Sequence, residues 1–460
     1  MSLTAVAWLA GVVCLAVLTL SRPAYGFALY LLTFFANPAY WWWGDEVPAI
    51  QWNFYSGWIF LIAAAVHASS SREATEKPGS GMVGVFAIAM VVNATAVHLL
   101  LAPDYSVSFD SYILLAKFVL LYFMIVSSAR TPRDYRLLLW AIVLGAAYVG
   151  YEITLNDRGH FARGRLEGAG VPGAKMANNL ASLFVVALPL AGALFFIGKR
   201  WEKWLAALTA PFILNVILLC SSRAAFLGLF AAAGTFLVAV PGRARKQALY
   251  GLTLAGVVTF FLMGDPDILA RFGTIFVSSE EQLDNSARSR LTYWTAGVRM
   301  IADHPLGAGG AGFKRAYASQ YLAAEGIDVQ ARSVHNGFIN DAAEWGLQGL
   351  TLHLLFIGSG VWLMLRVARH RNALGDRHGA VTCAALIGAM VAFLITCIFG
   401  DFLDAEWGYW IVALMVGYAR LHGPALEEQS VAAPRPVGAA APGLPQGVRQ
   451  PLGEAARTNG

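Results

Sequence analysis

Apolar runs of about 20 residues follow one another along nearly the whole chain, and they constrain its fold more than any other feature. A helix of this length spans the hydrocarbon core of a bilayer and satisfies its own backbone polar groups there. Charged residues make up only 13% of the chain, about half of their share in a soluble domain. The sequence therefore predicts an all-α polytopic membrane protein with about 12 transmembrane helices. The runs lie roughly at residues 3–20, 25–43, 52–68, 82–102, 111–128, 136–155, 179–197, 204–220, 223–240, 247–264, 346–366, 380–399 and 405–420.

Basic residues concentrate in alternate connections between these runs, and this indicates how the chain is oriented. Short cytoplasmic loops carry an excess of Lys and Arg, and the connections SSARTPRDYR, GKRWEK, PGRARK and RVARHRNALGDRH fit that rule. The last residues are rich in Ala, Pro and Gly and contain too few large apolar side chains to fold. We expect four parts: N-terminal transmembrane helices over 1–264, one long helical periplasmic loop over 265–335, C-terminal transmembrane helices over 336–421, and a disordered cytoplasmic tail over 422–460.

A group of cations on the expected outer side departs from the charge rule, and an anionic ligand would explain it. Arg can bind phosphate oxygens through two parallel, charge-assisted hydrogen bonds. A diphosphate carried by a membrane lipid at the outer surface fits this chemistry. Solvated Arg side chains, or a helix-end Arg that reaches toward the interface, are the alternatives. The group comprises Arg163, Arg165, Lys175, Arg223, Arg271, Arg288 and Arg290, together with His335.

The stretch ARSVHNGFINDAAEWGLQG places many polar residues at the start of a late apolar run. On a helix from about residue 336, the side chains of Asn336, Asn340 and Glu344 share one face, because they are spaced four apart. Polar groups that enter the bilayer must contact protein or water. Helix capping and helix–helix hydrogen bonds are one explanation of the Asn residues. His335, at the rim, is either a structural histidine or a group that takes a proton from a hydroxyl.

Two further ionisable residues, His98 and Lys117, lie inside apolar runs. Such residues are candidates for function, because a charge in hydrocarbon is costly. Neither has an evident partner in the sequence, so structural and functional roles both stay open.

Four motifs in this order resemble the O-antigen ligase/O-antigen polymerase superfamily, over roughly residues 160–350. They are RLEGAGVPGAKMANNLAS, SSRAAFLGL, RLTYWTAGVRMIADHPLGAGGAGF and HNGFINDAAEWGLQGL. The resemblance implies a metal-independent glycosyltransferase of the GT-C type in the bacterial inner (cytoplasmic) membrane, with its active site on the periplasmic face. Its donor would be a glycan linked to undecaprenyl diphosphate.

The resemblance also implies roles for individual residues. Arg165 matches the Arg before the Gly- and Asn-rich motif, Arg223 the Arg of the Ser-Arg motif, and Arg290 the Arg four residues before Trp. His335 matches the His of the His-Asn pair. The family often has Pro-Asn where this chain has Ala177-Asn178-Asn179, so either Asn could be the equivalent one.

From these residues we expect a specific division of roles. Arg165, Arg223, Arg288 and Arg290 would bind the diphosphate and stabilise the charge that grows on it. The expected catalytic residues are His335, Glu344 and Asn336: His335 orients or deprotonates the acceptor hydroxyl, Glu344 is the alternative base, and Asn336 fixes the imidazole or the acceptor. A diphosphate is already a good leaving group, so no metal and no cofactor are expected.

The expected function is ligation of O-antigen from undecaprenyl diphosphate to lipid A–core. An O-antigen polymerase and a protein O-oligosaccharyltransferase are alternatives that would share the donor chemistry. A transporter of lipids or sugars is an alternative from a different class, which would place charges near the middle of the membrane. The expected partners are the lipid-linked glycan donor, lipid A–core or another glycan or protein acceptor, and membrane lipids, with no nucleic acid.

Overall fold

The computed structural model describes residues 1–70, 80–162, 164–240 and 285–423 apart from 328–330, with a few positions between 242 and 257. Contacts divide the chain into Met1–Gly423 and Pro424–Gly460, and every described residue belongs to the first unit. Most of the expected run at 247–264 lies outside the described residues, as do positions 265–284 of the expected loop and the tail from 424.

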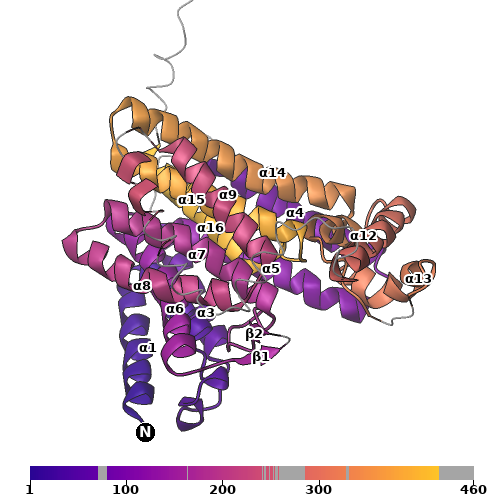
Figure 1. Ribbon diagram of the computed structural model, residues 1–460, viewed down its shortest axis with the longest axis horizontal. Coiled ribbons are helices and arrows are strands. Elements are labelled where there is room, and N and C mark those ends of the chain that lie inside the picture. The colour runs from indigo at the N-terminus through magenta and orange to yellow at the C-terminus, as the bar shows by residue number, and fades with distance from the viewer. Residues whose placement is uncertain are drawn as a thin grey trace, which may run out of the picture. The chain divides into compact units, whose positions relative to one another are not determined.

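Helices form nearly all of the described structure, as the apolar runs predict (Figure 1). One short antiparallel hairpin pairs Ala162 with Arg165. The helices are α1 (Leu3–Ser21), α2 (Pro23–Phe35), α3 (Trp52–Ser70), α4 (Ser80–Leu100), α5 (Tyr105–Ser128), α6 (Pro132–Leu155), α7 (Ala177–Ile197), α8 (Arg200–Leu219), α9 (Arg223–Ala239), α12 (Asn285–Asp303), α13 (Ala318–Ala323), α14 (Gly337–Ala373), α15 (Arg377–Ile398) and α16 (Glu406–His422), and the strands are β1 (His160–Ala162) and β2 (Arg165–Glu167).

Within the described residues, eight helices are long and apolar enough to cross a membrane, namely α1, α4, α5, α6, α7, α8, α14 and α15. The prediction of an all-α polytopic membrane protein is confirmed. The apolar run at 25–43 is not one helix: α2 ends at Phe35, and Asn37 caps a short 3-10 turn that begins at Pro38. Proline at this place favours a new turn, because it fixes its own backbone angle and donates no hydrogen bond.

Successive helices reverse direction, so the connections alternate between two ends of the helices. The basic connections contain ion pairs at one end: Arg22 approaches Asp134 at 3.6 Å, and Arg136 joins α6 to Glu202 of α8 at 3.2 Å. The connections 101–104, 156–176, 220–222 and 399–405 lie at the other end. The described members of the expected outer cation group, namely Arg165, Lys175, Arg223 and Arg290, lie at that second end.

Helices α9 and α15 pack tightly along their length, and small residues make this possible. A Cβ at Gly228 would lie 2.8 Å from the carbonyl oxygen of Ala392, and one at Gly388 would lie 3.2 Å from that of Ala232. The two helices are antiparallel, because Gly228 lies beside Ala392 and Ala232 lies beside Gly388. Residue numbers thus rise along α9 as they fall along α15. Arg223, the first residue of α9, therefore lies level with the last turn of α15.

Helix α14 is broken, although its sequence runs on as a helix. Its 37 residues would measure about 55 Å unbroken, well beyond the hydrocarbon core. Gly346 adopts a φ of 81° and breaks it into two segments. The first segment folds back, so that Nδ1 of His353 lies 3.4 Å from Oδ1 of Asp341, twelve residues earlier.

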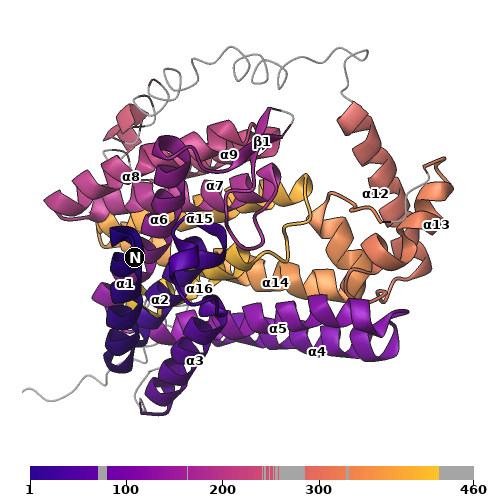
Figure 2. The ribbon, with the colours of Figure 1, turned by 90° about the horizontal axis from the view of Figure 1, so that it is seen from below.

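The Gly-rich stretch between α12 and α13 packs into this break. The backbone N–H of Gly309 donates to the carbonyl of Glu344 at 2.9 Å, and that of Leu347 donates to the carbonyl of Pro305 at 3.0 Å. Only glycine fits at Gly307, whose φ is 94° and whose added Cβ would lie 2.6 Å from the Glu344 carbonyl oxygen. Figures 1 and 2 show α12 and α13 at the ends of α4, α5 and α14.

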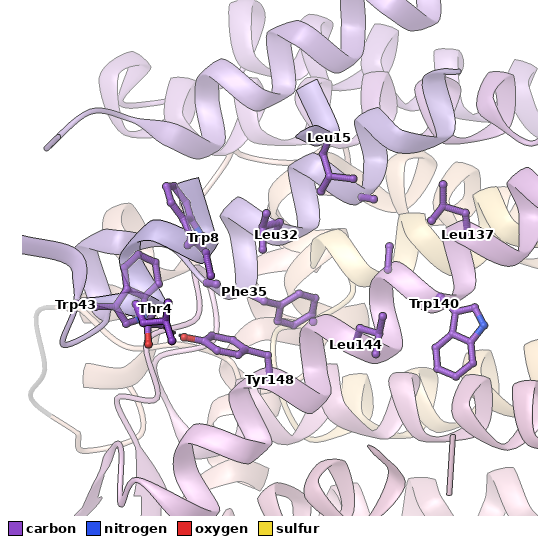
Figure 3. Close-up of a pocket in the computed structure, with 16 residues that line it drawn as sticks. Thr4, Trp8, Leu15, Leu32, Phe35, Trp43, Leu137, Trp140, Leu144 and Tyr148 are labelled. Atoms are coloured by element: carbon purple, nitrogen blue, oxygen red, sulfur yellow. Dashed lines mark hydrogen bonds between the residues drawn. The ribbon is translucent and has the colours of Figure 1, made fainter. Parts of the chain in front are cut away.

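A groove of about 660 Å³ lies between α1, α2 and α6. Figure 3 shows Thr4, Trp43 and Tyr148 at one end of it and Leu137 and Trp140 at the other. The indole of Trp43 donates to the Tyr148 hydroxyl at 3.1 Å. None of the residues that line this groove belongs to the expected site, and nearly all of them are apolar.

Candidate functional site

Arg165, on strand β2, joins two of the sequence motifs. Its Nε donates to the carbonyl oxygen of Cys220 at 3.0 Å, and its terminal nitrogen donates to Oδ1 of Asn178. The hydroxyl of Ser222 donates to the same Asn178 oxygen at 3.0 Å. These bonds hold the guanidinium plane in one orientation, beside the start of α9. The two motifs that contain Arg165 and Arg223 are therefore neighbours in space.

Asn178, and not Asn179, is the partner of Arg165. The side-chain nitrogen of Asn179 donates instead to the carbonyl of Gly173, at 3.2 Å. The structure thus distinguishes the two asparagines, either of which could match the family's Asn on sequence alone.

Arg223 opens α9 directly after a tight turn. Ser221 has a φ of 46°, and the Ser222 hydroxyl accepts the N–H of Ala225 as the helix cap. The Arg223 side chain is exposed. A helix N-terminus carries a partial positive charge, so this cation and the helix dipole both favour an anion at the same place.

His335 lies in a strained turn immediately before α14. Its φ is 58°, a left-handed conformation that is uncommon for a residue other than glycine. The side chain of Asp401 holds the turn from both sides: it accepts the backbone N–H of Asn336 at 3.0 Å and the hydroxyl of Ser333. The indole of Trp294 also donates to the His335 carbonyl, at 3.4 Å. A strained residue held by several bonds points to a functional site.

Cations surround the His335 imidazole. Burial, followed by the charges of Arg290, Arg332 and Lys314, lowers the pKa of His335 to about 4. The imidazole is therefore neutral at neutral pH. Arg332 also lies over the Tyr293 ring, 5.1 Å from its centroid.

The pKa of Asp401 is shifted in the opposite direction, upward. Burial and the nearby Asp404 raise the pKa of Asp401 to about 7, although backbone donors and Lys314 oppose the rise. A carboxyl group with this pKa exchanges its proton near neutral pH.

The expected polar face of α14 forms, and its members have distinct roles. Asn336 is the N-cap, and its side-chain oxygen accepts the N–H groups of Phe338 and Ile339. Asn340 donates to Oε1 of Glu344 at 3.0 Å. Glu344 is buried, with 5% of its surface exposed. Capping, one of the two explanations offered for Asn336, thus accounts for its side-chain oxygen.

The Arg165 and His335 clusters lie at the same end of the helices, on either side of the connection 399–405. Arg223 is level with the last turn of α15, which leads into this connection. On the other side, a Cβ at Gly337 would lie 2.9 Å from the backbone nitrogen of Leu403. Asp401 of the same connection holds the His335 turn. Segments that are far apart in sequence therefore approach one short loop.

The remaining expected residues have mixed outcomes. Lys175 is exposed. Arg163 and Arg271 lie outside the described residues, and the side chain of Arg288 is not described. The expected role of Arg288 in diphosphate binding stays a prediction, as do those of Arg165, Arg223 and Arg290.

The two ionisable residues within apolar runs differ from each other. His98 is buried, shares a 2.9 Å hydrogen bond with the Ser108 hydroxyl and stacks on Tyr112. The Ser108 hydroxyl in turn accepts the N–H of Gly310, so His98 supports the Gly-rich stretch. Lys117 is exposed on α5.

Sequence reasoning missed Lys314, Arg332 and Asp401, which act on His335 or its turn, and Asp404, whose charge acts on Asp401. Arg332 and Lys314 are cations in the segment already assigned to the site, and could have been included. The stretch GDFLDAEW has two acids at an outer connection, which was the available indication for the others. Within the described residues, no group of three or more His, Cys, Asp or Glu side chains could hold a metal ion.

These observations define a class: a polytopic, all-α membrane protein with cations gathered around a neutral imidazole at one end of its helices. Within that class, residues 207–354 match the family model described as O-antigen ligase. The match confirms the resemblance to the O-antigen ligase/polymerase superfamily; it contains Arg223, Arg290 and His335, and Arg165 precedes it. It indicates a glycosyltransferase-like membrane enzyme of the O-antigen ligase or polymerase type. A comparison with curated proteins gave no match.

Proposed function

We propose that the protein transfers a glycan from undecaprenyl diphosphate to an acceptor hydroxyl at the periplasmic face of the bacterial inner membrane. The acceptor that we propose is lipid A–core, so the reaction is O-antigen ligation. The family match supports the donor class. The observation that carries the proposal is the approach of two cationic clusters to one connection, 399–405, with a neutral imidazole beside it.

Arg165, Arg223 and Arg290 would bind the two phosphates of the donor. Asn178 and the Cys220 carbonyl orient the Arg165 guanidinium before the ligand arrives, which lowers the entropy lost on binding. As the anomeric C–O bond breaks, negative charge grows on the diphosphate. Fixed cations stabilise that charge more in the transition state than in the ground state, and this lowers the barrier. We propose that guanidinium groups supply the stabilisation, without a metal.

His335 would contact the acceptor hydroxyl through its neutral ring. A neutral imidazole can accept a hydrogen bond from the hydroxyl and align its oxygen with the anomeric carbon. Asn336 and Glu344 would support the His335 turn without contacting the acceptor. Asn336 caps α14, and Glu344 is buried and accepts a hydrogen bond from Asn340. We therefore propose them as positioning residues of this turn.

The test is glycan transfer by purified protein supplied with a defined lipid-linked donor and lipid A–core. His335→Ala and Arg290→Ala should each lower kcat/KM by about 100-fold or more, as the loss of one stabilising donor does in other enzymes. Arg299→Ala is the matched control on α12, because Arg299 is half-exposed and forms an ion pair with Glu325.

Full activity in both variants would reject the assignment of the site. Longer glycans on the lipid carrier without transfer to lipid A–core would favour a polymerase, and transfer to Ser or Thr of a protein would favour an oligosaccharyltransferase.

A further inference from the structure

A set of acidic side chains lies behind the His335 turn, and one of its atoms lacks a partner. Asp341 and Glu344 of α14 are buried, with 4% and 5% of their surfaces exposed. Oδ1 of Asp341 lies 3.4 Å from Nδ1 of His353, itself 2% exposed. Oδ2 of Asp341 is buried, and no described residue forms a hydrogen bond with it. Asp404 is close enough for its charge to act on Glu344, and Asp341 acts in the same way on Asp404.

A second buried polar group faces this set from another helix. Tyr409 of α16 is 1% exposed, and its hydroxyl also has no partner among the described residues. Its ring centroid is 5.8 Å from that of His353, and its hydroxyl is within electrostatic range of Asp341 and Asp404. An unsatisfied buried hydroxyl costs free energy, so its retention beside the acids suggests that it binds something there.

Few cations balance these acids. The charged and titratable groups that face them are Asp341, Glu344 and His353 from α14, Asp401 and Asp404 from the connection 399–405, Tyr409 from α16, Cys397 from α15 and Lys314 from the turn after the Gly-rich stretch. Among these described groups, Lys314 is the one basic side chain besides His353. Several carboxylates so close together in a poorly solvated place cannot all be ionised, so the set must retain protons.

We propose that Asp341, Glu344, Asp401 and Asp404, together with His353 and Tyr409, form a proton-accepting network for the transfer reaction, completed by water between Asp341 and Tyr409. This network, which we call the carboxyl network, rests on the proposed function. The cations around His335 oppose a positive charge on its imidazole. A proton taken up by the carboxyl network instead reduces the repulsion between its negative charges. Asp401 is the member that contacts the His335 turn, and so receives the proton first.

The acceptor O–H bond breaks as its oxygen forms a bond to the anomeric carbon. The bond from that carbon to the phosphate oxygen breaks, and its electron pair leaves with the lipid diphosphate. The proton of the acceptor passes to Asp401 and is shared within the carboxyl network until it returns to bulk water after the product leaves.

The pH dependence of transfer tests this role. Asp401 must be ionised to accept a proton, so kcat should fall as the pH drops through about 7. Asp404→Asn removes a negative charge that raises the pKa of Asp401, and should move the acid limb to lower pH by about one unit. A residue with a purely structural role would lower activity without moving the limb. Glu325→Gln is the control, because Glu325 pairs with Arg299 outside the network.

Infrared difference spectroscopy of the protein without substrate tests the network independently of activity. The wild type should show a band from protonated carboxyl groups that titrates near pH 7, and the band should shrink in Asp404→Asn and in Asp401→Asn. Tyr409→Phe should shift the band, because it removes the hydroxyl that we place beside Asp341.

Absence of the band, or an acid limb that does not move in Asp404→Asn, would overturn the inference even if the protein transfers glycan. A band with the expected behaviour in a protein that transfers no glycan would instead refute the proposed function and leave the shared protons established.

Discussion

At the scale of single residues, the proposed site depends on side chains that are held in place before any ligand binds. Arg165 has its guanidinium fixed by Asn178 and by a backbone carbonyl. His335 has its backbone fixed in a left-handed turn by Asp401. Such pre-orientation matters because a misplacement of about 1 Å can cost about two orders of magnitude in rate.

Asn178→Ala and Asn179→Ala form a matched pair that tests this orientation. Asn178→Ala removes a partner of Arg165, and a hydrogen bond to a charged group contributes about 1.5–3 kcal/mol. We expect the KM for the lipid-linked donor to rise about tenfold or more in Asn178→Ala, since about 1.4 kcal/mol is tenfold. Asn179→Ala should stay within about twofold, because its side chain contacts the Gly173 carbonyl instead. Equal effects in the two variants would contradict a specific role for Asn178.

At the scale of elements, the break in α14 and the Gly-rich stretch form one structural unit. The break frees backbone groups near Gly346, and the residues from Pro305 to Gly309 satisfy several of them. The same stretch contacts α5, since Gly310 donates to Ser108. The unit therefore connects the loop that carries His335 and Arg290 to α5 and α14.

Gly309→Ala should weaken this unit. Its φ is 80°, and an added Cβ would lie 2.6 Å from the Ala102 side chain. Gly326→Ala is the control, since Gly326 has a similar φ of 75° and nothing within 4 Å of the added Cβ. Both variants bear the backbone strain, but only Gly309→Ala adds a clash, which costs about 1–3 kcal/mol more. Thermal unfolding in detergent should show the lower Tm for Gly309→Ala. Equal Tm values would mean that the Gly-rich stretch accommodates the added methyl group without loss of stability.

Much of the element structure could be predicted from the sequence, because apolar length alone specifies a membrane helix. The helical face of Asn340 and Glu344 was also predictable, since spacing by four determines it. The break at Gly346 was not, because the apolar pattern continues across it and the cause is a backbone contact with residues about 40 positions earlier. Asp401 was missed for a similar reason: it holds the His335 turn from 65 residues away, which no local pattern records.

At the scale of the whole molecule, the central claim is that Arg165 and Arg290, 125 positions apart in sequence, bind one diphosphate. The antiparallel register of α9 and α15 and the contacts of the connection 399–405 support this claim. The membrane fold itself does not require it, because each cluster could be stable alone.

The affinity of the purified protein for undecaprenyl diphosphate, measured for the wild type, Arg165→Ala, Arg290→Ala and Arg299→Ala, tests this claim most directly. If both guanidinium groups bind one ligand, Arg165→Ala and Arg290→Ala should each raise the Kd about tenfold or more, and Arg299→Ala should leave it unchanged. A Kd that responds to only one of the two site variants would mean that the clusters do not share a ligand, and would contradict the account.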